Sequence, residues 1–190
     1  MSSPSDDFRP LLELVRKTEA NIKRIEGLQR DFIAYTLNEW RYATHHLCLA
    51  ICNGNEEDRQ KAENHLQRAY FDSCDIIVDC QLNRIAELET RFRGYVSTVA
   101  GLVGDFAEKC NCVHEAQNIR RLTVGGGVDR LEAYTRLACL ADKLDAFIKE
   151  LESTLPYWME DIRKQKRRDR LPIVIALIGI AVSICLAILF

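Results

Sequence analysis

The sequence predicts an all-α protein: a cytosolic bundle or hairpin of long helices, followed by a C-terminal transmembrane helix. Three observations predict this fold class. The chain has only four prolines and nine glycines in 190 residues, so obligatory helix breaks are few. Apolar residues recur three or four positions apart over long stretches, as they do on one face of an α-helix. The last twenty residues, LPIVIALIGIAVSICLAILF, contain no charged side chain.

Residues 171–190 have the length and composition of a membrane span. A helix of this length reaches about 30 Å, the thickness of the hydrocarbon core. Thirteen of the twenty residues are Leu, Ile, Val or Phe, and they favour insertion by roughly 4 to 8 kcal/mol before polar terms. Pro172 suits a first helical turn, where the N–H that it lacks would be unpaired. We therefore expect a tail anchor; burial in a soluble core is the alternative.

A basic collar precedes this span. Residues 163–170, RKQKRRDR, hold six basic side chains and one acidic one. Such a flank stays on the cytoplasmic side, which places residues 1–170 in the cytoplasm and the carboxylate of Phe190 outside. The first residues, MSSPSDDF, contain no apolar run, so no signal peptide is expected. The predicted location is a single-pass membrane protein, in the plasma or inner membrane if the host is prokaryotic.

The predicted cytosolic domain, residues 6–162, is acidic. It holds 20 basic and 27 acidic residues, a formal net charge of about −7. This sign argues against general binding of nucleic acid, although a local basic pocket remains compatible with it.

The first helix is expected to follow a disordered start at residues 1–5. Asp6 or Asp7 can cap it, and Pro10 lies in its first turn. Apolar residues then recur as far as Leu47, which predicts one long amphipathic helix, with a bend near Gly27.

A second long helix is expected from Asn55 to Phe106. Before it, Asn53 and Gly54 can supply left-handed backbone, and Asn55 can cap the new helix. From Leu88 onward its apolar residues are spaced four, three, four, three and four apart, a seam that requires a partner helix. That partner belongs either to an ordinary bundle core or to an intermolecular coiled coil. Three glycines, Gly94, Gly101 and Gly104, favour a bend or a close approach to a neighbour.

The remaining cytosolic residues predict two more helical segments. A short one covers residues 110–123, and the run TVGGGVD then forms a linker. Asp129 and Glu132 approximate a capping box for a helix that continues to Leu151, and Pro156 is expected to kink it. Beyond Pro156 the chain is amphipathic and basic. It either lies along the membrane surface or continues straight into the bilayer.

Four arginines are candidate ligand-binding residues. Arginine outnumbers lysine 14 to six in residues 1–162, and its planar guanidinium suits bidentate phosphate contacts. Two pairs of arginines predict a nucleotide or oligonucleotide ligand: Arg91 with Arg93, beside the seam, and Arg120 with Arg121, just before the linker. The alternative is that these arginines simply lie on solvated helix faces.

Small residues recur on one face of the predicted span, at Ala176, Gly179, Ser183 and Ala187. This spacing lets transmembrane helices pack closely, either as a bundle or around a pore to which Ser183 would contribute a hydroxyl. The alternative is that these small residues have this spacing by chance within an apolar run. We expect a homo-oligomer.

No metal or cofactor is expected. Most of the seven cytosolic cysteines are predicted to be reduced, small and buried. The nearest approaches to a metal-ligand set are His45 with Cys48 and Cys52, and the run CNCVH, but no C-x-x-C pair is present. The cytosolic cysteines are Cys48, Cys52, Cys74, Cys80, Cys110, Cys112 and Cys139, and CNCVH comprises residues 110–114.

Two pairs of residues match the R-x(4 to 6)-H spacing of HEPN-type helical ribonucleases: Arg41 with His46, and Arg59 with His65. A helical domain with this spacing and one transmembrane segment is similar in layout to small prokaryotic antiviral membrane effectors. The HEPN-like CRISPR-associated membrane protein is one example, and the membrane effector of the Hailong defence system is another. The resemblance implies oligomerisation through the cytosolic domain, disturbance of the membrane, and gating by RNA, DNA or small oligonucleotides. This chain differs from the CRISPR-associated example in carrying its predicted transmembrane span at the C-terminus.

These observations predict a self-assembling, tail-anchored membrane effector of antiviral defence that is gated by a nucleotide or oligonucleotide and is not an enzyme. A tail-anchored adaptor that binds another protein is the first alternative. A membrane-tethered HEPN-type ribonuclease is the second.

Overall fold

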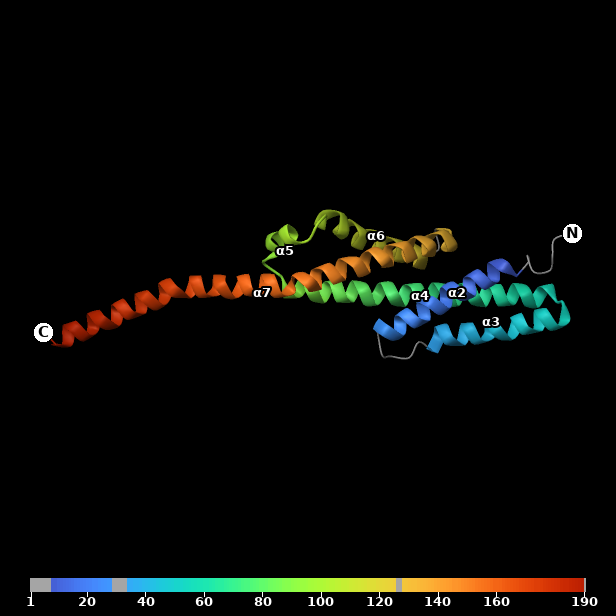
Figure 1. Ribbon diagram of the computed structural model, residues 1–190, viewed down its shortest axis with the longest axis horizontal. Helices are drawn as coiled ribbons and strands as arrows, with labels where there is room; N and C mark the ends of the chain where they lie inside the picture. The colour runs from blue at the N-terminus through green and yellow to red at the C-terminus, as the bar shows by residue number, and fades with distance from the viewer. Residues whose placement is uncertain (1–7, 29–33, 126–127, 190) are drawn as a thin grey trace.

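The computed structural model describes residues 8–28, 34–125 and 128–189; beyond Tyr157 it describes side chains only at 159, 160, 163, 164, 168 and 172. The described chain contains six helices and no strand, which confirms the all-α class (Figure 1). The helices are α2 (Arg9–Leu28), α3 (Ala34–Asn53), α4 (Glu56–Arg91), α5 (Val96–Leu102), α6 (Phe106–Gly125) and α7 (Arg130–Leu189).

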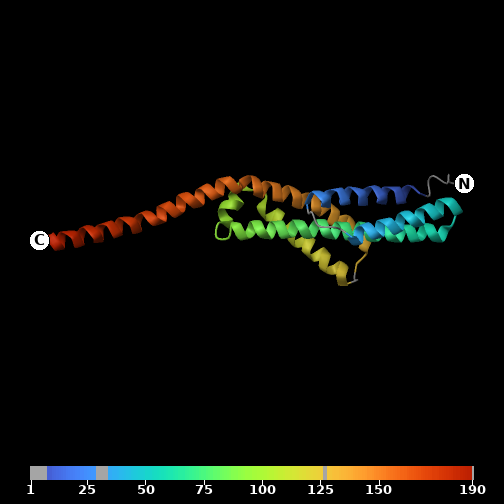
Figure 2. The same ribbon diagram turned by 90° about the horizontal axis from the view of Figure 1, so that it is seen from below.

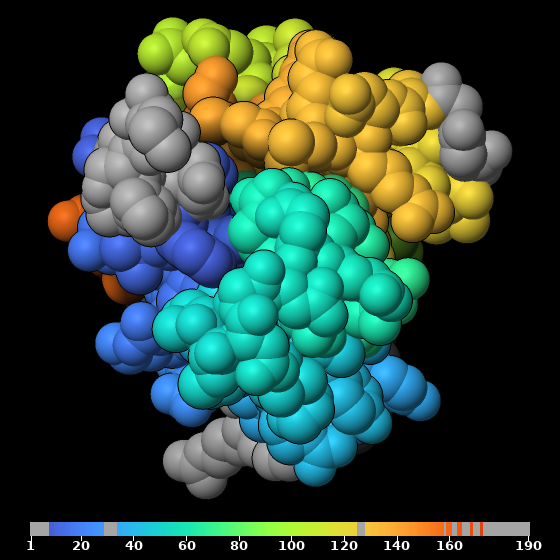
Figure 3. Space-filling view, turned by 90° about the vertical axis from the view of Figure 1, so that its right-hand side faces the viewer, coloured from blue at the N-terminus to red at the C-terminus, as the bar shows by residue number. Residues whose placement is uncertain are grey.

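Helix α4 is the centre of the bundle and contacts α2, α3 and α7 along its length. Helices α2, α4 and α7 run in one direction, whereas α3 and α6 run in the opposite one (Figures 1 and 2). Helix α6 packs mainly on α7. Viewed end-on, the α3–α4 turn stands in front, with the start of α2 on one side and the α6–α7 end on the other (Figure 3). The second half of α7 extends away from all other helices (Figure 1).

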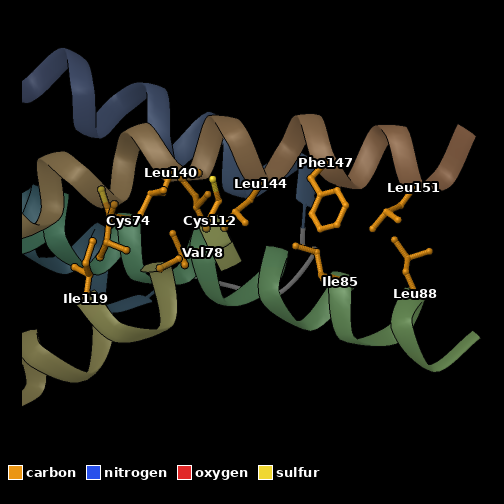
Figure 4. Close-up of a cluster of buried hydrophobic side chains, with 14 of the residues drawn as sticks. Cys74, Val78, Ile85, Leu88, Cys112, Ile119, Leu140, Leu144, Phe147 and Leu151 are labelled. Atoms are coloured by element: carbon orange, nitrogen blue, oxygen red, sulfur yellow. The ribbon is translucent and has the colours of Figure 1, made fainter. Parts of the chain in front are cut away.

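The main core lies between α4 and α7. Figure 4 shows Val78, Ile85 and Leu88 of α4 facing a row of apolar side chains from α7, with α6 closing one side. Of the α7 row, Leu144 is fully buried and Phe147 is 2% exposed. A smaller cluster joins Leu11 of α2, Ala43 of α3 and Leu66 of α4. The seam predicted from Leu88 onward therefore belongs to a bundle core, at least at Leu88, Phe92 and Val99, which are buried within one chain.

The prediction of a single first helix is wrong. Helix α2 ends at Leu28, and α3 runs back antiparallel to it from Ala34. The buried positions explain the error: each helix buries every seventh residue, and the step from Ile25 to Thr36 is eleven residues, close to three turns. The periodic pattern therefore stays in phase across the reversal. The capping residues Asp6 and Asp7 lie outside the described residues, and Pro10 is in the first turn of α2 as predicted.

The predicted turn between α3 and α4 is confirmed for two of its three residues. Gly54 adopts a left-handed φ of 64°, whereas Asn53 does not. Asn55 is the N-cap of α4, and its side chain accepts a 2.9 Å hydrogen bond from the N–H of Glu57. Three acidic residues in the first turn of α4 further stabilise the positive end of the helix dipole.

The second predicted helix is also shorter than expected. It ends at Arg91 because Gly94 takes a left-handed φ of 88°, which no helix interior contains. The chain then forms α5 and turns again at Asp105, where φ is 51°. Glu150 of α7 holds this second turn in place: its Oε1 accepts a 2.9 Å hydrogen bond from the N–H of Gly104, and its carboxylate pairs with Lys109. The Lys109 ammonium keeps the pKa of Glu150 below its usual value.

Helix α7 begins as predicted and continues much further. Asp129 Oδ1 accepts a 3.1 Å hydrogen bond from the N–H of Glu132, which confirms the cap. The helix then runs unbroken through Pro156 and Pro172 to Leu189, and it changes direction as it leaves the bundle (Figure 2). The two predicted arrangements beyond Pro156, along the membrane surface or straight into the bilayer, both stay predictions, because a continuous helix is compatible with each. Where side chains are described, no helix is long and apolar enough to span a bilayer. Apart from Pro172, the side chains of the predicted span lie outside that set.

Candidate functional site

Two histidine–carboxylate pairs connect α3 and α4 in opposite directions. Nδ1 of His46 on α3 lies 2.9 Å from Oδ1 of Asp58 on α4. Nδ1 of His65 on α4 lies 2.7 Å from Oε2 of Glu39 on α3. An ionised carboxylate only accepts hydrogen bonds, so each Nδ1 carries the proton and donates, and Nε2 is the remaining nitrogen of each ring. These pairs fix both imidazole rings against the helices.

The two histidines lie together, although they are 19 positions apart in the sequence. Their rings are nearly parallel, with an interplanar angle of 4° and centroids 5.6 Å apart. Tyr42 lies 5.5 Å from the His65 ring, and His45 lies 5.5 Å from the His46 ring. The side chains of His46 and His65 are 21% and 22% exposed, so both are reachable from solvent. Two anchored imidazoles at this separation can act as a general base and a general acid on one substrate.

The arginines of the two R-x-H matches make other contacts. The guanidinium of Arg41 lies 5.1 Å from the centre of the Tyr42 ring, within the range of a cation–π contact. Arg59 donates from Nε to Oε2 of Glu56 at 2.8 Å. The structure thus brings together the two histidines of the motif. Their carboxylate partners, Asp58 and Glu39, were missed because no short sequence pattern links them to the histidines.

A third carboxylate, Asp72, lies near Glu39, the partner of His65. Burial raises the pKa of Asp72, and the nearby carboxylates of Glu39 and Asp75 raise it further, while Arg68 lowers it. Negative charge beside the histidines favours a cationic group over an anionic one, so a phosphate substrate would depend on the arginines and on protonated imidazole.

The four arginines predicted to bind a ligand do not form one site. Arg91 ends α4 and Arg93 follows in the next turn, whereas Arg120 and Arg121 belong to the far end of α6. Arg120 pairs with Asp79 at 2.7 Å and with Asp75 at 3.5 Å. Because Asp79 precedes Arg91 by twelve residues, the two pairs of arginines lie about 18 Å apart along α4.

The structure separates the cysteines into three groups. Cys74 and Cys112 are buried as predicted, and Cys80 and Cys110 are half-buried. The prediction is wrong for the other three, Cys48, Cys52 and Cys139, which are exposed because they lie on outer helix faces. Burial raises the pKa of the Cys74 thiol to about 11. Among the residues that the structure describes, no three His, Cys, Asp or Glu side chains form a group suited to a metal ion.

The small residues of the predicted span belong to α7, but their side chains lie outside the described set. The helical backbone preserves the spacing that places Ala176, Gly179, Ser183 and Ala187 on one side.

Comparisons with known proteins add no assignment to this geometry. No family model matches the chain, and no curated protein or solved structure matches it.

Proposed function

We propose that the protein is a tail-anchored membrane effector whose cytosolic bundle acts on the bilayer through α7. In this proposal residues 171–190 span the membrane once and residues 163–170 stay at its cytoplasmic surface. Several copies associate and bring their tail helices together through Ala176, Gly179, Ser183 and Ala187. Binding of a nucleotide or oligonucleotide to the bundle then permits or blocks the passage of ions, as part of a defence response.

The observation that carries the proposal is the continuity of α7. Its first half supplies Leu137, Leu144 and Phe147 to the bundle core, and its second half reaches the predicted span without a break in the helix. A protein that is merely tethered needs no rigid connection between its domain and its anchor. A gated effector needs one, because a change of packing in the core must reach the membrane segment.

The test is to interrupt this connection while keeping both ends. A seven-residue Gly/Ser insertion after Glu160 should abolish permeabilisation of liposomes by the purified protein, because Gly and Ser form a flexible coil. An insertion of seven helix-forming residues at the same point is the control, and it should retain most of the activity.

Equal activity of both insertions would reject mechanical coupling through α7. No leakage or conductance from the unmodified protein, with or without nucleotides, would reject the effector function itself. Native mass spectrometry in detergent provides the matching test of self-assembly, and a monomer under all conditions would contradict it.

A membrane-tethered ribonuclease is the second candidate, and the pairing of His46 with His65 favours it. One imidazole would take the proton of a ribose 2′-OH, and the other would protonate the leaving 5′-oxygen. The double change His46→Ala and His65→Ala should then abolish cleavage of RNA by the purified protein. His114→Ala, on α6 and outside the cluster, is the control. Cleavage that persists in the double variant would remove these histidines from the reaction.

A further inference from the structure

Helix α3 lies at the outer edge of the bundle (Figure 3). Among the described helices it packs closely on α4 alone, and it meets α2 only in the small cluster around Ala43. The side of α3 that faces α4 is marked by the buried residues Thr36, Ala43 and Ala50, one every seven positions. The opposite side of α3 is covered by no other described helix.

This uncovered side carries residues at the spacing of a coiled-coil seam. Six positions follow one another at intervals of three, four, three, four and three, so they lie on one face of the helix. Leu49 is half-buried and the other five are exposed, with Tyr35 84% exposed. Apolar and aromatic groups that stay exposed together mark interaction sites. The six residues, called the outer seam below, are Tyr35, Asn38, Tyr42, His45, Leu49 and Cys52.

The outer seam contains no acidic or basic residue other than His45, although the domain that carries it is acidic. Residues 1–162 have a formal net charge of about −7, whereas α3 contains one Glu and one Arg in its 20 positions. That Glu, Glu39, is bonded to His65 of α4. A second acidic domain therefore meets less like-charge repulsion along α3 than on an average face, and a strongly charged partner finds few ions to pair with.

The polar residues of the outer seam can bond to copies of themselves. The amide of Asn38 and the neutral imidazole of His45 each contain a donor and an acceptor, and so does a tyrosine hydroxyl. Neither the Asn38 nor the His45 side chain forms a hydrogen bond with the residues that the structure describes. A carboxylate only accepts and a guanidinium only donates, so a seam of such groups requires a different partner. The outer seam instead fits a second copy of the same helix.

The direction of α3 decides how two copies would lie in one membrane. Helix α3 runs antiparallel to α7 along the side of the bundle (Figures 1 and 2). A parallel pair of α3 helices, with a twofold axis along them, would therefore point both α7 helices the same way. An antiparallel pair would point them in opposite directions. A parallel pair also places each seam residue opposite its own counterpart, and a single Asn in a seam fixes such a register.

We propose that the outer seam is a docking surface for a second copy of this chain, and that the two α3 helices pair in parallel and in register. The proposal deepens the proposed function, because it names the face through which copies associate, and its orientation rests on the tail anchor. It is tested by cross-linking alone, so that either can fail without the other. One 20-residue helix gives a small interface, and anchorage in one membrane raises the effective concentration of the copies.

Cross-linking of the concentrated full-length protein in detergent tests the pairing, because Cys52 lies in the outer seam. A variant that keeps Cys52 and replaces Cys48 and Cys139 by Ser should form dimers with a short bismaleimide. In an antiparallel pair Cys52 would lie opposite Tyr35, and the two Cys52 residues would be about 25 Å apart, beyond the reach of the reagent.

The matched control keeps Cys139, which is exposed on α7, and replaces Cys48 and Cys52 by Ser. A third variant, with all three cysteines replaced, gives the background. Dimers that form through Cys52 and not through Cys139 are expected. Equal yields from the two variants, or no dimer above background through Cys52, would overturn the proposal.

A charge placed in the outer seam tests the same interface without a cross-linker. Asn38→Glu should weaken the dimer about tenfold or more, because two carboxylates would meet where two amides paired. Asn118→Glu, the same change at an exposed asparagine of α6, should leave the dimer unchanged. Analytical ultracentrifugation measures the dimer dissociation constant. Circular dichroism checks that both variants fold, as expected for changes at exposed positions. Equal dissociation constants for the two variants would overturn the proposal.

Discussion

His46 and His65 stack in parallel, and each is held at Nδ1 by a carboxylate from the opposite helix of the α3–α4 hairpin. The two helices therefore exchange equivalent contacts, one in each direction. This reciprocity connects the stability of the hairpin to the same groups that could carry out acid–base chemistry.

Asp58→Asn should destabilise the protein by about 1 to 3 kcal/mol, because Asp58 is nearly buried and bonds both His46 and Asn55. Urea unfolding in detergent measures the change. Glu57→Gln is the matched control: it removes a charge from the same turn and an exposed pair with Lys61, both of which contribute little to stability in solvent. Equal effects would mean that the contacts of Asp58 with His46 and Asn55 contribute nothing.

Gly94→Ala should destabilise the protein by about 1 to 2 kcal/mol, because a side chain at φ 88° is strained. Gly101→Ala should do the reverse and stabilise by up to about 1 kcal/mol, since Gly101 lies within α5 and has free space around it. Thermal unfolding of the two variants shows whether each change lowers or raises the stability. A neutral result at Gly94 would show that the chain can end α4 in another conformation.

Asp72→Asn should stabilise the protein at neutral pH and change its pH dependence. The pKa of Asp72 is raised in the folded state, mainly by burial. The folded protein therefore binds this proton more tightly than the unfolded chain, and the contribution of Asp72 to stability falls as pH rises through that pKa. Unfolding free energies between about pH 4 and pH 7 should rise more with pH in the variant than in the wild type. An unchanged profile, equal to that of the exposed control Glu89→Gln, would contradict burial of Asp72.

Cys74 should resist alkylation by iodoacetamide at about pH 8, where its thiol, with a pKa near 11, is almost entirely protonated. Cys48, Cys52 and Cys139 should be labelled first because they are exposed. Peptide mass spectrometry after timed labelling gives the order. Denaturant should abolish the protection of Cys74, and rapid labelling of Cys74 without denaturant would place it outside the core.

The sequence was sufficient to predict the helical class and the local signals of helix boundaries. Asn55 and Asp129 cap helices as expected, because a cap depends on a side chain and an N–H only two or three residues away. The reversal between α2 and α3 was not predictable in the same way. The buried positions continue in phase from Ile25 to Thr36, so the pattern alone cannot distinguish one long helix from two antiparallel ones.

The sites show the same division between local and distant relationships. The spacing of Arg41 to His46 and of Arg59 to His65 drew attention to both histidines, but their partners Asp58 and Glu39 depend on how the helices pair. The excess of arginine over lysine drew attention to Arg120. In the structure, however, Arg120 forms ion pairs with Asp75 and Asp79, which lie more than forty positions earlier in the sequence. Gln81 of α4 is 1% exposed and donates to the carbonyl oxygen of Ala141 on α7, yet it gave no signal in the sequence, because an isolated amide becomes unusual only when the surrounding helices bury it.

The unbroken α7 also fixes how the bundle would be positioned over a bilayer. Among the side chains that the structure describes, the last buried one on α7 is Thr154, and Leu171 lies 17 positions further along the helix, which corresponds to a stand-off of about 25 Å. In a continuous helix, height and orientation are coupled, since each residue removed lowers the bundle by about 1.5 Å and rotates it by about 100° around the helix axis. Deletions in this segment would therefore change activity periodically with their length rather than progressively.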